Sequence, residues 1–373
     1  MIIGIPKEIK NWENRVSLTP AGAKVLVDSG HKVFIQKDAG LGSGFTDKEY
    51  SNVGAEILPA IEDIYRKAEM IIKVKEPQES EYDLLQKGQI LFTYLHLAVE
   101  PDLTQVLLDR KVTGIAYETI QTGKGELPLL TPMSEIAGRM SVQIGASLLE
   151  NPHGGRGVLL GGVPGVVPAD VVIIGGGTVG LNAAKIAYGM GASVTVLDLN
   201  LNRLRYIDDI YQGKIKTLIS NSSNLEICTS YADLLIGAVL IPGAKAPNLI
   251  TEKMVKKMKK GSVIVDVAID QGGIVETIDK VTTHENPVFS KHNVMHYSVA
   301  NIPGAVARTS TLALTNATLP YAVNIANKGF VKAVKSCEEL TKGVNTHQGH
   351  LVSEPVAESL NMEHTELSML IGF

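Results

Sequence analysis

The feature that most constrains this 373-residue chain is a glycine-rich segment at positions 175–180, Gly-Gly-Gly-Thr-Val-Gly, taken together with its flanks. A run of β-branched residues at 171–174 precedes it, and an alanine-rich helical pattern at 181–187 follows it. A second apolar run at 193–197 then ends at Asp198. Strand, turn, helix and strand in this order, with an acidic residue about 20 positions after the glycines, are typical of a dinucleotide-binding βαβ unit.

The spacing of these residues has a physical reason. Gly175 allows a tight turn, Gly177 lets the backbone approach a pyrophosphate, and Gly180 lets the helix pack closely on the strand. The N-terminus of the helix then offers free N–H groups to phosphate oxygens. Asp198 is expected to accept hydrogen bonds from ribose hydroxyls, which favours NAD, although Arg203 is a residue type that can accept a 2′-phosphate. A glycine-rich turn without a ligand is the alternative.

Composition narrows the class of protein. Hydrophobic residues make up 45% and charged residues 20% of the chain, which is ordinary for a globular enzyme. A net charge of −4 argues against a nucleic-acid partner. The most apolar window, 157–180, contains two prolines and an aspartate, so no membrane span is expected. Cys228 and Cys337 lack metal-ligand spacing, which argues against a zinc site or disulfide framework and fits a reducing cytoplasm.

Short apolar runs alternate with helical patterns along nearly the whole chain, which predicts an α/β fold with two doubly wound parallel sheets. The expected strands lie at 2–5, 32–36, 70–74, 89–95, 112–117, 171–174, 193–197, 234–241, 262–267 and 293–299. Long helical stretches at 134–150 and 311–328 are expected to connect two domains. We therefore predict a Rossmann-type NAD-binding domain at 129–306 and a discontinuous substrate domain formed by 1–128 and 307–373.

Polar residues follow several of the predicted strands, and in open α/β sheets ligands bind outside the carboxyl ends of the strands. In the first series these residues are Lys7, Glu8, Arg15, Lys75, His96 and Glu118, and in the second they are Asp198, Asp270 and Asn301. An arginine with a lysine suits a substrate carboxylate, and a histidine suits proton transfer near neutral pH. A second proton carrier, or a residue that holds the nicotinamide side of the site, is the role expected for Asp270.

Each of these residues also has a purely structural interpretation. Arg15 is equally consistent with a charge on a surface loop, and Lys75 with a solvent-facing lysine on an alternating strand. His96 follows an apolar run and fits a histidine satisfied within the core. Asp270 fits a cap of the turn that continues through two glycines. The functional interpretation gains weight because all four reactive types fall at the same edge of their predicted sheets.

With these residues in view, the chain resembles the bacterial L-alanine dehydrogenases along essentially its whole length. The resemblance rests on the motifs at 4–8 with Arg15, 75–77, 93–96, 133–138, 175–180, 270–273 and 301–306. It implies reversible, NAD-dependent oxidative deamination of L-alanine to pyruvate and ammonia by a cytoplasmic homohexamer. Two positions depart from the usual pattern: Ile302 stands where a methionine is usual, and Ala307 where a proline is usual.

The same resemblance implies roles for particular residues. Arg15 and Lys75 would bind the carboxylate and carbonyl region of the substrate, and His96 and Asp270 would be the acid/base residues. No metal ligand is expected. The cofactor would be lined by Ser134, Gly175, Gly177, Thr178, Val179, Gly180, Asp198, Arg203, Ser220, Val239, Leu240, Val267, Ala268, Ile269, Asp270, Ser298, Val299, Ala300 and Asn301.

Two other functions remain open at this point. The family is similar to the NAD-binding part of proton-translocating transhydrogenase, which binds and exchanges cofactor without deaminating an amino acid. The other alternative is a related amino-acid dehydrogenase with a larger, lysine-type substrate. Retention of Arg15, Lys75 and His96 argues against the transhydrogenase function, whereas side-chain specificity is not readable from the sequence.

Overall fold

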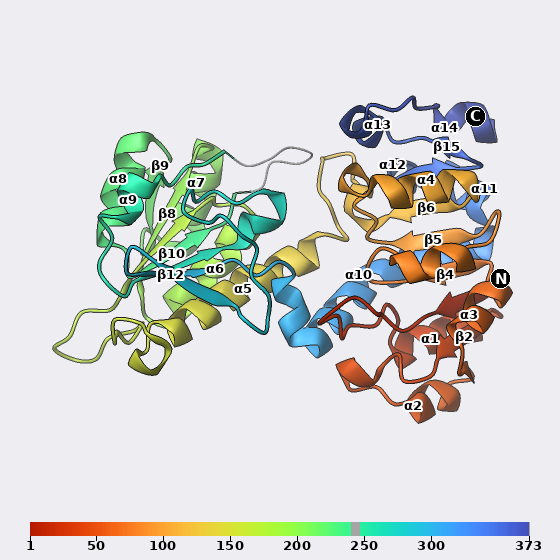
Figure 1. Ribbon diagram of the computed structural model, residues 1–373, viewed down its shortest axis with the longest axis horizontal. Helices are drawn as coiled ribbons and strands as arrows, with labels where there is room; N and C mark the ends of the chain where they lie inside the picture. Colours follow the sequence, from red (N-terminus) through yellow and green to blue (C-terminus); the bar gives the residue numbers. More distant parts are fainter. Residues whose placement is uncertain (240–246, 373) are drawn as a thin grey trace. The chain divides into compact units, whose positions relative to one another are not determined.

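Two mostly parallel sheets, each in its own part of the chain, organise the computed structural model, which describes residues 1–239 and 247–372 (Figure 1). Unit 1 comprises Met1–Met133 and Val306–Phe373, and unit 2 comprises Ser134–Ala305. The α/β fold class predicted from the alternation of strands and helices is confirmed. Of the expected site residues, Leu240 lies outside the described residues.

The sheet of unit 1 has eight strands in the order β15-β14-β6-β5-β4-β1-β2-β3. Their bounds are β1 Ile2–Ile5, β2 Lys32–Gln36, β3 Glu56–Leu58, β4 Met70–Ile72, β5 Ile90–Thr93, β6 Thr113–Ala116, β14 Val344–His347 and β15 His350–Leu351. The first six strands are parallel, and their order reverses between β1 and β4. Ligands of doubly wound sheets bind at such a reversal, outside the carboxyl ends of the strands.

The helices α1 and α2 of unit 1 begin at threonines whose side chains cap them. Thr19 accepts a hydrogen bond from the backbone N–H of Gly22, and Pro20 occupies the first turn of α1. Thr46 and Glu49 form a capping box at the start of α2. The helices are α1 Pro20–Asp28, α2 Asp47–Asn52, α3 Ile61–Lys67, α4 Pro101–Asp109, α10 Ala307–Lys328, α11 Phe330–Lys335, α12 Glu338–Gly343, α13 Glu354–Leu360 and α14 Leu367–Ile371, with 3-10 turns η1 Leu41–Ser43, η2 Glu79–Leu84, η3 Leu97–Val99 and η4 Tyr117–Thr119.

The sheet of unit 2 repeats the same order in its parallel part, with β9-β8-β7-β10-β11-β13 followed by the antiparallel edge strand β12. The strands are β7 Asp170–Ile174, β8 Ser193–Asp198, β9 Lys216–Ile219, β10 Leu234–Gly237, β11 Val263–Asp266, β12 Val288–Lys291 and β13 Val294–Tyr297. The helical elements are α5 Thr131–Leu148, α6 Thr178–Gly189, α7 Leu201–Tyr211, α8 Ser222–Tyr231, α9 Glu252–Val255, η5 Asn151–His153, η6 Val267–Gln271 and η7 Ile302–Val306. The order reverses between β7 and β10.

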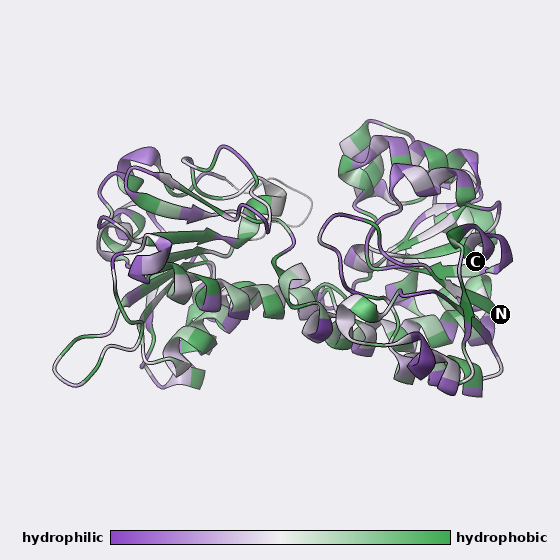
Figure 2. Ribbon diagram, turned by 60° about the horizontal axis from the view of Figure 1, so that its bottom comes forward, coloured by the Kyte–Doolittle hydropathy of each residue, from purple (hydrophilic) through white to green (hydrophobic). Residues whose placement is uncertain are grey.

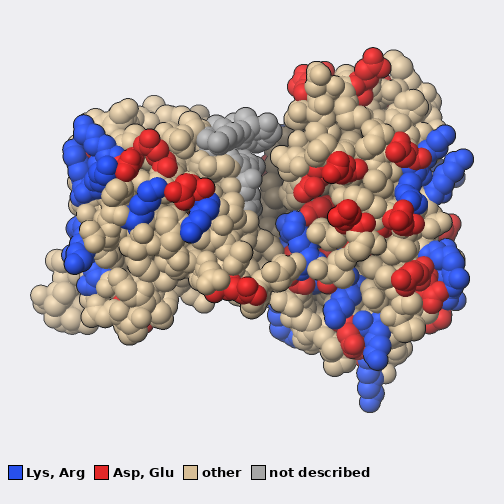
Figure 3. Space-filling model, viewed as in Figure 1, with Lys and Arg blue, Asp and Glu red and all other residues tan. Residues whose placement is uncertain are grey.

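Both faces of the unit 2 sheet are buried, which explains why its strands read as continuous apolar runs. In β7, Val171 and Ile173 pack in a core with the alanines of α6. Val172 and Ile174 point the other way and pack in a second core with Leu225 of α8. Figure 2 shows the apolar strands inside and the hydrophilic residues on the outer helices. On the viewed face of unit 1, basic and acidic side chains are interspersed (Figure 3).

Some elements differ from the sequence prediction. The strands β3, β9, β12, β14 and β15 were not expected, and β12, β14 and β15 pair antiparallel. His292 and Asn293 join β12 to β13, and both have positive φ, as a tight hairpin turn requires. The helix α9 ends at Val255, so most of the basic run at 253–260 follows it. Within the described part of the chain, no helix has the length and apolarity needed to cross a bilayer.

Candidate active site

The glycine-rich turn after β7 is built so that two of its glycines have no substitute. Gly175 has a φ of +102°, and a Cβ there would lie 2.6 Å from the carbonyl oxygen of Ala238. A Cβ on Gly180 would lie 1.7 Å from the carbonyl oxygen of Gly175, so only glycine fits. Gly177 is different, because a Cβ there would meet no atom within 4 Å. The backbone at Gly177 is therefore open to a ligand from outside.

The N-terminus of α6 adds an electrostatic reason for an anion to bind at this turn. Gly177 is the N-cap of this 12-residue helix and provides no side-chain acceptor for the first backbone N–H groups. Thr178 is exposed, and Val179 is half-buried. Unpaired N–H groups and the positive end of the helix dipole suit phosphate oxygens. The residues at this turn therefore fit the pyrophosphate of a dinucleotide.

Asp198 ends β8 beside the same turn. Its Oδ2 accepts a hydrogen bond from the backbone N–H of Gly176 at 2.6 Å, and its Oδ1 accepts one from Asn200 at 2.7 Å. Arg203 donates from Nε to the carbonyl oxygen of Gly176, and its guanidinium lies 5.0 Å from the centre of the Tyr206 ring. Asp198 and Arg203 are both half-buried, and both are held by the backbone of the glycine-rich turn.

The neighbouring strand ends carry the other predicted cofactor residues. Val239 follows β10 and is half-buried, and Val267, Ala268 and Ile269 lie in η6 after β11. The backbone of Asp270 belongs to η6, but its side chain lies outside what the structure describes. All of these positions lie at the carboxyl edge of the unit 2 sheet, next to the reversal of strand order.

A buried carboxylate that sequence reasoning missed closes the η6 turn. Asp266 accepts hydrogen bonds from the backbone N–H groups of Ala268 at 3.0 Å and of Ile274 at 2.8 Å. Burial raises the pKa of Asp266 to about 6. A Cβ on Gly237 or Gly273 would lie 2.8 Å from a carboxylate oxygen of Asp266, so both neighbours are restricted to glycine. An acidic residue within an otherwise apolar strand was the available signal.

The remaining predicted cofactor residues differ in exposure. Ser298 and Val299 are buried, and the Ser298 hydroxyl donates to the carbonyl oxygen of Lys280 at 3.0 Å. Asn301 has a φ of +64°. Ser134, Ser220 and Ala300 are half-buried.

In unit 1, Arg15 and Glu13 form a buried ion pair in the segment between β1 and α1. The Arg15 Nε lies 2.7 Å from Glu13 Oε1, and Nη2 lies 2.5 Å from Oε2, so the contact is bidentate. On its other side, Nη1 lies 3.1 Å from the Met133 sulfur. Burial opposes ionisation of Glu13, but Arg15 outweighs it and lowers the pKa of that carboxyl. The guanidinium is thereby fixed in orientation.

Lys75 lies just beyond the end of β4 and is half-buried. Burial and the nearby Arg15 guanidinium lower its pKa. Among the described residues, no acidic side chain lies within salt-bridge distance of its Nζ. A half-buried ammonium without such a partner is unfavourable unless a ligand supplies the anion.

His96 follows β5 in a left-handed backbone conformation, with φ of +51°. The backbone N–H of His96 donates to Glu118 Oε1 at 2.6 Å. The centre of the His96 ring lies 5.9 Å from the centre of the Tyr94 ring, and the two rings are nearly parallel. The buried Tyr94 hydroxyl donates to the carbonyl oxygen of Leu129 at 2.7 Å. Non-glycine residues in this strained conformation concentrate at functional sites.

Arg15, Lys75 and His96 follow parallel strands of one sheet, so they lie at the same edge of unit 1. Tyr94 links them, because it stacks on His96 and is close enough to Arg15 for the guanidinium charge to affect its pKa. Sequence reasoning missed Glu13, although its position two residues before Arg15 was a signal.

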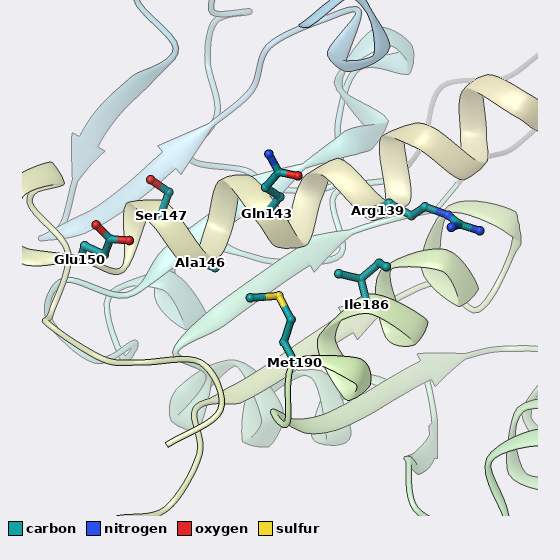
Figure 4. A pocket seen from close by; sticks show the side chains of 7 residues that line it. All are labelled: Arg139, Gln143, Ala146, Ser147, Glu150, Ile186 and Met190. Atoms are coloured by element: carbon teal, nitrogen blue, oxygen red, sulfur yellow. The ribbon is translucent and has the colours of Figure 1, made fainter. Parts of the chain in front are cut away.

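A hollow of about 400 Å³ runs along α5 (Figure 4). Its lining consists of Arg139, Gln143, Ala146, Ser147, Glu150, Ile186 and Met190. None of these is a predicted site residue, so this hollow is separate from the cofactor turn.

Comparison with known proteins identifies the family of this chain. Residues 4–137 match the family model "Alanine dehydrogenase/PNT, N-terminal domain", and residues 141–354 match "Alanine dehydrogenase/PNT, C-terminal domain". The chain is 64% identical over 365 residues to an alanine dehydrogenase of Methanococcus maripaludis, covering 98% of both chains. It is 61% identical over 364 residues to that of Bacillus subtilis, covering 98% of this chain and 96% of the relative.

Solved structures show the same fold. An L-alanine dehydrogenase superposes with a TM-score of 0.94 at 52% identity, covering 97% of this chain and 99% of that one. A transhydrogenase from Sinorhizobium meliloti superposes with a TM-score of 0.81 at 23% identity, covering 95% and 99%. The resemblance seen in the sequence is confirmed: this chain is a member of the alanine dehydrogenase/PNT family.

Proposed function

We propose that this chain is an NAD-dependent L-alanine dehydrogenase that converts L-alanine, water and NAD to pyruvate, ammonia and NADH, reversibly. The proposal is carried by two cations of unit 1: the buried, oriented guanidinium of Arg15, and the half-buried ammonium of Lys75, which has no acidic side chain at salt-bridge distance among the described residues. The alanine dehydrogenases that match nearly the full chain support the identity of the substrate.

The charges of this pair fit a substrate with one carboxylate. Arg15 and Lys75 contribute two positive charges and Glu13 contributes one negative charge, which leaves one net positive charge. Glu13 engages two nitrogens of the guanidinium, so the Arg15 charge has a fixed orientation when it meets a ligand. Pyruvate supplies one carboxylate and one carbonyl oxygen, and both are groups that these donors bind.

Proton transfer is assigned to His96 and Asp270. NAD held by unit 2 would supply the acceptor for the hydride that leaves the substrate Cα. His96 then takes the proton from the water that adds to the imino carbon, and delivers a proton to the departing ammonia. Glu118 accepts a hydrogen bond from the backbone N–H of His96 and so fixes the position of the backbone from which the imidazole ring extends. Asp270 serves as the second proton carrier in this scheme.

Cofactor binding is assigned to unit 2. The turn at Gly175–Gly180 and the first N–H groups of α6 would hold the pyrophosphate, and Asp198 would accept hydrogen bonds from the adenosine ribose. A carboxylate at this position disfavours the 2′-phosphate of NADP, so we propose NAD as the cofactor. The strand ends at Val239, 267–270 and 298–301 would line the nicotinamide half.

We also propose that the protein is a cytoplasmic homo-oligomer, with a hexamer as the expected state. The segment 157–168 carries no charged residue, and its side chains Leu159, Val163, Val166 and Val167 are all more than half exposed. An apolar surface of this kind favours contact with another protein chain. Both cysteines are free thiols, as expected in a reducing compartment. Light scattering of the purified protein measures the assembly directly.

The test is a rate measurement of NADH formation on the purified protein across a panel of amino acids, with NAD and NADP compared. We expect turnover of alanine with NAD, and at least tenfold lower kcat/KM with NADP or with lysine-type substrates. Preference for a larger amino acid would support the related dehydrogenase instead. Exchange of hydride between NADPH and an NAD analogue, without alanine turnover, would support a transhydrogenase subunit.

A further inference from the structure

Two lysines near the end of β4 have opposite environments. Lys73 is completely buried, and its Nζ lies 3.2 Å from Glu8 Oε2 and 2.9 Å from Glu81 Oε1. Lys75, two residues later, is half-buried and has no acidic partner at salt-bridge distance among the described residues. The chain therefore uses one lysine inside the unit and keeps the other available for a ligand.

Glu8 connects these two environments. While its Oε2 faces Lys73, its Oε1 accepts a hydrogen bond from the backbone N–H of Val74 at 2.6 Å and a longer one from that of Lys75 at 3.4 Å. One buried carboxylate thus contacts three consecutive residues. Glu8 follows β1, so these contacts cross from β1 to β4 at the reversal of strand order, where ligands of such sheets bind.

Glu8, Lys73 and Glu81 form a buried charged cluster, and Glu81 anchors this cluster in the core. Glu81 is buried, and it accepts hydrogen bonds from the Tyr65 hydroxyl at 3.0 Å and from the backbone N–H of Gln78 at 2.8 Å. Burial raises the pKa of Glu8, which shows that its ionised form is costly to hold there. Buried ion pairs of this kind add little net stability compared with well-packed apolar residues. Stability alone therefore does not account for the cluster.

We propose that Glu8 is a positioning residue of the substrate site, which holds the backbone of residues 74 and 75 so that the Lys75 ammonium meets the substrate carboxylate. Lys73, Glu81 and Tyr65 anchor Glu8 from the core. The proposal rests on the assignment of Lys75 to substrate binding under the proposed function.

The kinetic test compares Glu8→Ala, Glu8→Gln and the matched control Tyr65→Phe, which loosens the same cluster without contacting residues 74 and 75. We expect Glu8→Ala to raise the KM for pyruvate at least tenfold, with the NADH dissociation constant changed less than twofold. Glu8→Gln keeps an oxygen for the Val74 N–H and should recover most of the loss. Tyr65→Phe should lower the melting temperature and leave KM within twofold. An unchanged KM in Glu8→Ala, or an equal rise in Tyr65→Phe, would overturn the proposal.

A second readout does not depend on turnover. In protein labelled with ¹³C-lysine, the Cε signal of Lys75 is assigned by its loss in Lys75→Gln and titrated by NMR. We expect the titration of Lys75 to shift in Glu8→Ala, because the backbone that holds its ammonium near Arg15 is released, and to match wild type in Tyr65→Phe. If Glu8→Ala does not fold, Glu8→Asp, which withdraws the carboxylate by one methylene, serves instead. Identical titrations in wild type and variant would refute the role of Glu8, whereas failure of the wild type to oxidise alanine would refute the proposed function alone.

Discussion

At the scale of single residues, the chemistry of unit 1 depends on how two cations are held. The Arg15 guanidinium is gripped on two nitrogens by Glu13, so its orientation is set before any ligand arrives. Lys75 has the complementary property, since its charge is not satisfied by an acidic side chain of the described residues. A fixed cation, together with an ammonium that has no acidic partner at salt-bridge distance among the described residues, fits the small carboxylate of the proposed substrate.

Arg15→Lys tests the importance of the guanidinium fork. Lysine keeps the positive charge but loses the planar set of donors, so the bidentate contact to Glu13 is lost. We expect the KM for pyruvate to rise at least tenfold, about 1.4 kcal/mol, with NADH binding unchanged. Arg66→Lys is the matched control, because Arg66 is an exposed arginine of the same unit that is paired with Asp63. Equal KM values for Arg15→Lys and wild type would contradict the assignment.

His296 predicts a pH dependence of stability. It is buried in β13, where its Nε2 lies 2.8 Å from the Thr277 hydroxyl, and burial lowers its pKa to about 4. Below about pH 6.5, the ordinary pKa of histidine, this residue is protonated in the unfolded chain. In the folded chain it stays neutral until the pH approaches 4. The stability it contributes is therefore complete above about pH 6.5 and is lost as the pH falls toward 4.

His296→Gln removes this titration while it keeps a hydrogen-bonding side chain. The free energy of unfolding is measured with urea at about pH 5 and at about pH 6.5. Between these two pH values it should rise by on the order of 2 kcal/mol more in the wild type than in the variant. Asp266 also titrates in this range, but its contribution to the free energy of unfolding is the same in both proteins and cancels in the difference. Parallel pH curves for the two proteins would mean that His296 is not held neutral in the folded state.

At the scale of elements, the βαβ unit of β7, α6 and β8 contains two glycines that the fold requires and a third, Gly177, that the fold does not require. Gly175 and Gly180 have backbone atoms in the space of a Cβ, whereas Gly177 has open space. A substitution at Gly180 should therefore damage the fold, and one at Gly177 should damage only binding.

Gly177→Ala is expected to leave the melting temperature within a few degrees of wild type and to weaken NADH binding at least tenfold, because the added methyl occupies the path of the pyrophosphate. Fluorescence titration of NADH measures this directly. Gly189→Ala, at the other end of α6, has equally open space and should bind NADH normally. Normal NADH binding by Gly177→Ala would place the pyrophosphate elsewhere.

At the scale of the whole molecule, local signals predicted most of the architecture. The caps at Thr19 and the glycines at 175–180 act within a few residues, so their elements were readable from the sequence. The hairpin β14–β15 was not, because its pairing with β6 joins segments more than 200 residues apart. The alternation at 73–75 likewise left a solvent-facing interpretation open for Lys75, and the burial of Lys73 between Glu8 and Glu81 was not readable from the sequence.

The proposed function requires that a hydride pass directly from the Cα of alanine to the nicotinamide of the cofactor. The most direct test incubates the purified protein with L-alanine deuterated at Cα and unlabelled NAD, and follows deuterium at the nicotinamide C4 by NMR. The account predicts one deuterium in each NADH formed, together with one pyruvate and one ammonia. Reduced cofactor without deuterium, or no reduced cofactor at all, would contradict it.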